Sequence, residues 1–349
     1  MEVFILNNHF ETLGVIDYFA SAIFSDNYNA MDDFELYVPV TAEALEILQI
    51  NYFVFSDSQP DKFYIIDNVK IETDAENADY ITVTGKGTEK YIYNRIAWGL
   101  NQLSGSMAQC IEKLIKDNLT APSDERRKNS LVKIGNLYSG NYMTKQTTGG
   151  NLLEEVQEIL DKDEAGFKMT YDGNAFVFST FKGKDRSYDQ DSNMPILFSP
   201  DFDNLLSTEY QKNAENFANV ALVAGEGEGI DRKMATVGTA SGRERIEVYV
   251  DARQLSSNTE GEELTEEEYL TVLQENGKEA LAEMKISESF EAEVVPGVSY
   301  EFKKDYFVGD IVTIINEYGM QLNSRIVKAV EAWDENGYNL VLTFEKKEV

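Results

Sequence analysis

The feature that most constrains the fold is a series of short apolar runs separated by polar turns. Residues 69–71 and 80–84 alternate apolar and polar side chains with a period of two, and they flank an acidic turn at 72–79. This period places successive side chains on opposite faces of a strand. Similar short runs recur at 3–6, 34–38, 52–55, 63–66, 290–295, 311–315, 326–332 and 340–344. The pattern predicts a mainly β chain of paired strands.

Four segments instead show helical signals. Each begins at a residue whose side chain caps a helix, and two of the caps have a glutamate at capping-box spacing. The caps are Thr41, Ser106, Asn151 with Glu154, and Thr265 with Glu268. The expected apolar stripes are Ala42, Leu45 and Leu48; Met107, Ile111, Leu114 and Ile115; Leu152, Val156, Ile159 and Leu160; and Leu270, Leu273, Leu281 and Met284. The last helix should end near Met284.

The order of these patterns indicates several folded units. At 349 residues the chain is long enough for two to four of them. Residues from about 99 to 185 are predicted to form an α/β insertion with a hairpin at 167–179. An apolar pattern typical of strands returns at 196–224, so the first β domain is expected to be discontinuous. Residues 225–229 (Gly-Glu-Gly-Glu-Gly) read as a flexible acidic link. Residues 325–344 repeat the strand, acidic turn and strand of 65–84, which suggests two similar β domains.

Charge and rare residues exclude several function classes. The chain has 62 acidic and 31 basic side chains, so binding to nucleic acid or to an anionic membrane surface through Lys and Arg is not expected. Cys110 is the only cysteine and His9 the only histidine. One chain therefore builds no disulfide, thiolate cluster, Ser-His-Asp triad or two-histidine metal site. His9 is interpreted as an ordinary residue near a strand end and Cys110 as a small buried hydrophobe.

The remaining candidate motifs have structural explanations. A glycosidase needs two carboxylates about 5–10 Å apart, and no pair stands out among the acidic residues. An acidic loop has oxygen ligands for calcium but lacks EF-hand spacing, so a solvated loop is favoured; its acids are Asp185, Asp189, Asp191, Asp201 and Asp203. Two glutamates in 225–229 would repel a phosphate. The cluster Glu260, Glu262, Glu263, Glu266, Glu267 and Glu268 reads as a helix N-terminus, where the helix dipole favours acids. The sequence thus predicts no catalytic, cofactor-binding or metal-binding residues and no cofactor.

The N-terminal segment carries no secretion signal and no apolar run is long enough to span a membrane, so synthesis in a reducing cytoplasm is expected.

Several strings, taken in order, resemble a family of siphophage and prophage tail proteins related to the baseplate (tail-tip) hub and to the N-terminal module of tail-associated lysins. These are residues 80–86 leading into 91–96, then 198–205, 216–227, 245–253 and 308–312. The resemblance covers nearly the whole chain. It implies an α+β, mainly β fold with two related β-barrel-like domains, each interrupted by an insertion. The expected domains are 1–98 plus 196–224, with an α/β insertion at 99–195, and 225–255 plus 290–349, with a helical insertion at 256–289.

The resemblance also implies a function. Proteins of this kind form a homotrimeric hub ring that joins the tail tube to the tip and is not enzymatic; lytic activity belongs to C-terminal extensions, which are not expected beyond Val349. Implied partners are the distal tail protein or tail tube, the tape-measure protein, and a needle, fibre or lysin at the tip of the virion tail. DNA is expected only in transit, past an acidic lumen that repels phosphate, and no stable membrane binding is expected. The alternatives are a glycan-cleaving tail enzyme with a carboxylate pair and a carbohydrate-binding adhesion module. A tailocin would use the same hub.

Overall fold

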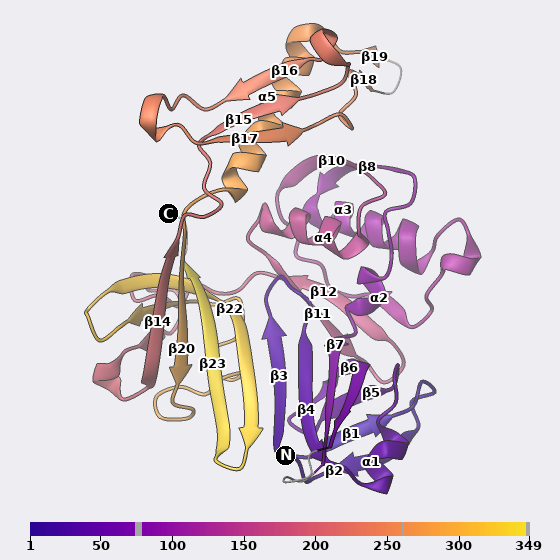
Figure 1. Ribbon diagram of the computed structural model, residues 1–349, viewed down its shortest axis with the longest axis vertical. Coiled ribbons are helices and arrows are strands. Elements are labelled where there is room, and N and C mark those ends of the chain that lie inside the picture. The colour runs from indigo at the N-terminus through magenta and orange to yellow at the C-terminus, as the bar shows by residue number, and fades with distance from the viewer. Residues whose placement is uncertain (74–78, 260–261, 347–349) are drawn as a thin grey trace. The chain divides into compact units, whose positions relative to one another are not determined.

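The protein, described by a computed structural model over residues 1–73, 79–259 and 262–346, is mainly β (Figure 1). Strands hold 43% of it and helices 19%, so the predicted class is confirmed. The chain divides into two compact units: unit 1 consists of Met1–Glu209 and Phe290–Val349, and unit 2 of Tyr210–Ser289. The four domain ranges expected from the sequence stay predictions.

The first part of unit 1 is a run of antiparallel strands. Its elements are β1 (Val3–Leu6), β2 (Thr12–Ile16), β3 (Ser21–Asn27), β4 (Asp33–Pro39), α1 (Ala42–Ile47), β5 (Phe53–Ser56), β6 (Gln59–Glu72) and β7 (Tyr80–Gly87). Alternate residues of these strands face one core, in which Leu36, Val54, Ile66, Ile81 and Val83 are fully buried. The acidic turn expected between β6 and β7 lies partly outside the described residues.

The short helix α1 begins where predicted but buries a different stripe. The Thr41 hydroxyl accepts the N–H of Ala44 at 3.0 Å, as expected of an N-cap. Ala44, Ile47 and Leu48 are buried, whereas Leu45 is 40% exposed. The prediction was wrong here because a helix of six residues is oriented by its tertiary contact: Ile47 packs over Gly14 of β2, where an added Cβ would lie 2.9 Å from Ile47 Cδ1.

The insertion of unit 1 contains two amphipathic helices and two small sheets. Its elements are α2 (Lys90–Tyr93), β8 (Leu100–Ser106), α3 (Met107–Ile115), β9 (Val132–Ile134), β10 (Tyr142–Thr148), α4 (Leu152–Asp161), β11 (Gly166–Tyr171) and β12 (Phe176–Phe181). Ser106 and Gln109 form a capping box at α3, and Asn151 caps α4. All eight residues predicted for the two apolar stripes are buried, and β11 and β12 form the predicted hairpin.

An aromatic cluster joins this insertion to the first strands. The Phe10 ring stacks on Phe53 at 4.9 Å between centroids and on Tyr171 at 5.2 Å. Phe63 of β6 lies 4.8 Å from Tyr171 and 5.9 Å from Phe176. Because aromatic rings bury large apolar areas, these contacts hold β11 and β12 firmly against β5 and β6.

The chain then returns to the large sheet. The strands are β13 (Leu197–Phe198), β14 (Leu205–Asn213), β20 (Ser287–Val294), β21 (Ile311–Ile315), β22 (Gln321–Asp334) and β23 (Gly337–Lys346). The strand order is β14-β20-β23-β22-β3-β4-β7-β6-β5-β1-β2, with β21 pairing β13 and β22 beside this path. The path has two ends, so this sheet does not close, and the barrel-like detail of the prediction is not confirmed.

The two hairpins that echo each other in sequence share a structural detail. In β6, Ile66 pairs with Gly85 and Asn68 with Thr84, so one residue bulges between them. In β22, Ile326 pairs with Phe344 and Lys328 with Thr343, which leaves a bulge at the corresponding place. Both first strands have 14 residues. The echo is therefore present in the register of the hairpins.

Unit 2 is a small sheet covered by one helix. Its strands β15 (Val220–Ala224), β16 (Met234–Val237) and β17 (Glu247–Asp251) lie in the order β16-β15-β17, and α5 (Glu266–Glu283) packs on β15 and β16; β18 (Asn258–Thr259) pairs with β19 (Glu262–Glu263). The predicted Thr265–Glu268 capping box is present. Of the predicted stripe only Leu273 is fully buried, because Tyr269 and Gly277 face the sheet beside it. At Gly277 a Cβ would lie 2.6 Å from Val223 Cγ2, so helix and sheet approach closely.

Short 3-10 turns and one π turn complete the chain: Lys116–Thr120, Glu125–Arg127, Pro200–Phe202, Gly229–Asp231 and Gly242–Glu244. None of the described helices combines the length and the apolar character needed to cross a membrane.

Candidate functional site

The two rare residues lie in ordinary surroundings. His9 is exposed in the turn between β1 and β2, and its backbone N–H donates to Asn7 Oδ1 at 2.9 Å. Cys110 is buried on α3, as predicted. Its burial raises the pKa of the thiol, so little of the reactive thiolate forms at neutral pH.

Two aspartates of the acidic loop after β12 accept hydrogen bonds from neighbouring residues of the protein. Asp185 Oδ1 accepts the N–H and the hydroxyl of Ser187 at 3.0 and 2.7 Å, and Asp189 Oδ2 accepts from Asn323 at 2.7 Å. Asp201 and Asp203 lie at the 3-10 turn Pro200–Phe202. Over residues 1–73, 79–259 and 262–346, no group of three or more His, Cys, Asp or Glu side chains is arranged to hold a metal ion.

Residues 225–229 are not the flexible link that their composition suggested. They open the connection between β15 and β16, which pair antiparallel with Ala224 opposite Met234. The N–H of Gly225 donates to the Lys233 carbonyl at 2.8 Å, and the N–H of Lys233 donates to the Glu226 carbonyl at 3.0 Å. The segment therefore belongs to a hairpin loop inside unit 2. Glu260 of the acidic cluster lies outside the described residues, while Glu266 and Glu268 are exposed in the first turn of α5.

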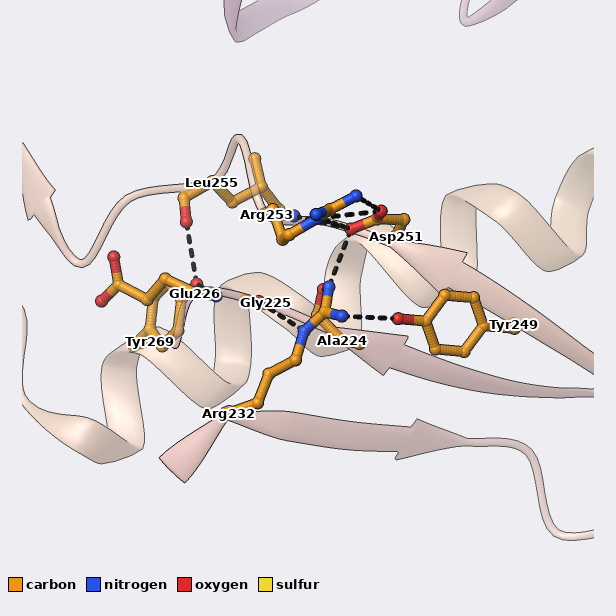
Figure 2. Close-up of polar contacts among 9 residues, drawn as sticks. All are labelled: Ala224, Gly225, Glu226, Arg232, Tyr249, Asp251, Arg253, Leu255 and Tyr269. Carbon is orange, nitrogen blue, oxygen red and sulfur yellow. Dashed lines mark hydrogen bonds and ion pairs between the residues drawn. The ribbon is translucent and has the colours of Figure 1, made fainter. Parts of the chain in front are cut away.

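Arg232 binds this loop to the end of β17 (Figure 2). Its Nε donates to the Gly225 carbonyl at 3.0 Å and its Nη2 to the Ala224 carbonyl at 2.9 Å. Nη2 also reaches Asp251 Oδ1 at 2.8 Å, and Nη1 donates to the Tyr249 hydroxyl at 2.8 Å. The planar fork of an arginine suits such divergent oxygen acceptors.

Asp251 is shared between two arginines. Arg253 donates from Nε to Asp251 Oδ1 at 2.9 Å and from Nη2 to Oδ2 at 2.5 Å, beside the bond from Arg232. The hydrogen bonds from Arg253, together with the one from Arg232, lower the pKa of Asp251 to about 2. The carboxylate is therefore charged at all ordinary pH values and balances part of the arginine charge.

On the other side of the loop, Tyr269 of α5 completes the clamp. Its hydroxyl accepts the N–H of Glu226 at 2.9 Å and donates to the Leu255 carbonyl at 2.8 Å. Figure 2 shows Tyr269 of the helix reaching toward Glu226, whereas Arg232 is part of the loop itself. We call Arg232, Asp251, Arg253 and Tyr269 the arginine clamp.

An open depression of about 420 Å³ lies beside the clamp. Its lining residues are Glu226, Gly227, Glu228, Gly229, Arg232 and Arg253. The two glutamates oppose an anionic ligand, and the arginines beside them are already bound to Asp251. The hydrogen bonds of Arg232 to the Gly225 and Ala224 carbonyls and to Asp251 stabilise the loop.

A second charged cluster is buried in unit 1. Lys62 Nζ lies 2.7 Å from Asp32 Oδ2 and 3.0 Å from Asp26 Oδ1. Glu89 is 2% exposed, and its Oε2 has no hydrogen-bond partner among the described residues. Burial, helped by the negative charge of Asp32, raises the pKa of Glu89 to about 8. Burial would lower the pKa of Lys62, but Asp26 and Asp32 outweigh it and raise that pKa well above its ordinary value.

The sequence did not reveal this buried cluster. Its members come from β3, from the turn before β4, from β6 and from the start of α2, and charged residues at strand ends are usually solvated. The ion pairs of Lys62 with Asp26 and Asp32 balance the charge inside the cluster, which is a structural role.

The fold defines the class of protein. The chain is similar to a tail protein of Neisseria meningitidis MC58 (TM-score 0.63, 13% identity, 99% of this chain and 96% of that chain). It is also similar to a 43 kDa tail protein of prophage MuSo2 from Shewanella oneidensis (0.58, 11%, 99% and 98%). A third similar structure is the prophage tail protein gp18 of Listeria monocytogenes EGD-e (0.53, 13%, 100% and 96%). The fold is that of phage and prophage tail proteins.

The family follows from the sequence itself. Residues 2–344 match the model of the Siphovirus ReqiPepy6 Gp37-like protein family, and the chain belongs to that family. The resemblance to siphophage and prophage tail proteins is thereby confirmed. No curated protein sequence matches the chain.

Proposed function

We propose that this chain is a structural, non-enzymatic subunit of a phage or prophage tail tip and that three copies form a hub ring. The observation that carries the proposal is the full-length match: one tail-protein fold accounts for 99% of this chain and 96% of the similar chain. The charged clusters support it, because the arginine clamp and the Lys62 cluster are both used internally.

In this proposal the ring joins the tail tube to the tip and lets the tape-measure protein and DNA pass. Its neighbours are the distal tail protein or tail tube on one side and a needle, fibre or lysin on the other. The hub is made in the bacterial cytoplasm and is active in the virion. Two β domains with insertions at 99–195 and 256–289 would form the wall of the ring, and the shared bulge of the β6–β7 and β22–β23 hairpins supports their relationship.

The proposal is tested by cryo-EM and light scattering of the full chain with its tube-side neighbour. A three-fold ring with a central passage is expected. A chain that stays monomeric in that complex would refute the ring. The electrostatic potential calculated from the same reconstruction tests the passage. Because the chain has 62 acidic and 31 basic residues, a negative lumen that repels phosphate is expected. A basic lumen would contradict this.

The non-enzymatic role is tested separately. The full chain is incubated with purified bacterial cell wall, and released reducing ends and amines are measured. No release above a heat-treated sample is expected. Release that disappears in a carboxylate variant would establish the glycan-cleaving alternative.

A further inference from the structure

Strands β8 and β10 form a two-stranded ribbon in the insertion of unit 1 (Figure 1), and the two faces of this ribbon differ in character. Side chains alternate between the two faces of a strand. On the inner face Asn101, Leu103 and Thr147 are buried, and β8 packs on α3. The outer face consists of four cross-strand pairs, which together we call the ribbon face: Leu100 with Thr148, Gln102 with Gln146, Ser104 with Thr144, and Ser106 with Tyr142.

The ribbon face is polar but carries no charged side chain. Its residues are two glutamines, two serines, two threonines, one tyrosine and one leucine, although Asp, Glu, Lys and Arg make up 27% of the chain. Thr144, Gln146 and Thr148 are exposed, so their hydroxyl and amide groups, which both donate and accept hydrogen bonds, are open to a ligand. Lys145 lies on the inner face instead and pairs with Glu155 at 2.7 Å. The ribbon face therefore offers hydrogen bonds without charge.

Exposed aromatic rings lie at or beside both ends of the ribbon. Tyr142 is 73% exposed, and its hydroxyl forms a hydrogen bond of 2.7 Å with Ser104 Oγ of the opposite strand. This bond holds the ring along the ribbon. Just before β8, Trp98 is 65% exposed although Ala97 beside it is buried, and the Arg127 guanidinium carbon lies 4.6 Å from the centroid of the indole. Rings held in place in this way present apolar surface with little side-chain entropy left to lose on binding.

The chemistry of the ribbon face selects among ligand classes. The centre of a protein–protein interface is usually apolar, whereas the centre of this face consists of glutamine, serine and threonine. Nucleic acids and anionic lipids are bound through Lys and Arg, which this face lacks, and the net charge of −31 repels other polyanions. An uncharged polysaccharide fits, because its hydroxyl groups match amides and hydroxyls and the C–H face of a sugar ring packs on an aromatic ring.

We propose that the ribbon face binds an uncharged, extended polysaccharide. Tyr142 stacks on one sugar ring, and the amides of Gln102 and Gln146 bind sugar hydroxyls at the centre of the face. From Leu100 to Ser106 the face extends about 20 Å, since a strand rises about 3.3 Å per residue, and this length suits a chain of several sugars. Glycan binding is a function in addition to the proposed hub and does not depend on the ring, because the whole face belongs to one chain.

The test measures the migration of the full chain in native gels that contain a polysaccharide. The uncharged probes are dextran, galactomannan and hydroxyethylcellulose, and carboxymethylcellulose is the anionic counterpart of the last. An array of uncharged bacterial oligosaccharides widens the set of probes. Wild type should be retarded by an uncharged polysaccharide or bind an uncharged glycan of the array, and carboxymethylcellulose should not retard it. Binding to none of these probes, or equal retardation by carboxymethylcellulose and hydroxyethylcellulose, would overturn the inference.

Two variants locate the site, each with a matched control. Tyr142→Ala should weaken binding about tenfold through the loss of stacking, whereas Tyr318→Ala should not, since Tyr318 is 82% exposed elsewhere in unit 1. Gln102→Ala combined with Gln146→Ala removes two amides and should weaken binding about fivefold or more. Gln321→Ala, at an exposed position of β22, should leave binding unchanged.

Sedimentation velocity of the same proteins with the tube-side neighbour separates this inference from the proposed hub. Tyr142→Ala should assemble as wild type does while it loses glycan binding. If both ribbon variants bind the glycan as tightly as wild type, the inference is overturned and the hub stands. If Tyr142→Ala loses glycan binding and assembly together, Tyr142 serves the assembly and the inference is overturned as well. A wild-type chain that binds the glycan but stays monomeric would refute the hub alone.

Discussion

Units 1 and 2 each contain a charged cluster, and the two clusters differ in what sets the pKa of their carboxyl groups. In unit 1 Lys62 is enclosed with Asp26, Asp32 and Glu89, and burial raises the pKa of Glu89 to about 8. In unit 2 Asp251 is at the surface, and hydrogen bonds from Arg253 and Arg232 lower its pKa to about 2. Burial thus raises the pKa of a carboxyl group, whereas hydrogen bonds from arginine lower it.

The largest expected effect comes from removing the buried cation. Lys62→Met leaves Asp26 and Asp32 without their partner, which should reduce the free energy of unfolding by about 3–5 kcal/mol. Urea unfolding followed by circular dichroism measures it. Lys70→Met is the matched control, because Lys70 and Glu72 are both more than half exposed and their pair contributes about 0–1 kcal/mol. Equal losses in the two variants would contradict the buried role of Lys62.

The second effect is a dependence of stability on pH. The pKa of Glu89 is higher in the folded chain (about 8) than its ordinary value of 4.5, so the folded state keeps a proton that the unfolded state releases. The contribution of Glu89 to the free energy of unfolding is complete below about pH 4.5 and is lost as the pH rises through 8. Between these two pH values the free energy of unfolding falls by up to about 1.4 kcal/mol per pH unit. Glu89→Gln should flatten this slope in urea titrations at pH 5, 7 and 9. Glu46→Gln, at an exposed site, should keep the wild-type slope; the same slope in all three proteins would rule out Glu89 as its source.

A smaller and local effect is expected in unit 2. Arg232→Ala removes donors to the Ala224 and Gly225 carbonyls and to Asp251, and should cost about 1.5–3 kcal/mol. Hydrogen exchange of the Gly225 and Lys233 amides should accelerate, because these amides hold the hairpin loop. The exposed Arg243→Ala carries the same charge change and should leave both amides protected. Unchanged exchange in Arg232→Ala would mean that the clamp does not hold the loop.

The smallest effect concerns titration alone. Arg253→Ala removes the leading cause of the lowered pKa of Asp251, so the midpoint should rise from about 2 toward its ordinary value of 3.8 while Arg232 keeps it below that value. Because the pKa of Asp251 is lower in the folded chain, its charged carboxylate stabilises the fold above about pH 3.8, and this stabilisation is lost as the pH falls through about 2. In Arg253→Ala the same loss should occur at a higher pH. Carboxyl carbon NMR measures the midpoint, and an unchanged value would assign the shift to Arg232.

The prediction from sequence succeeded where the signal is local. The caps at Ser106, Asn151 and Thr265 each satisfy backbone groups within three residues, so the sequence around them suffices to place α3, α4 and α5. It failed at α1 and in part at α5, where the buried face depends on the sheet against which each helix packs. The interpretation of 225–229 as a link failed for the same reason, since glycine and glutamate do not show that flanking strands pair.

By itself the sequence determined the mainly β class, the capped helices and the family, and it showed that one chain can form neither a disulfide nor a two-histidine metal site. Periodicity, capping and residue counts are properties of neighbouring residues or of totals, so they can be read without the fold. Only the tertiary structure decided that β22 pairs with β3, some 300 residues away in the chain, that Lys62 meets Asp26 and Asp32, and that Trp98 stays outside while Ala97 is buried. These contacts join distant segments, and their energies depend on the burial and partners that folding alone supplies.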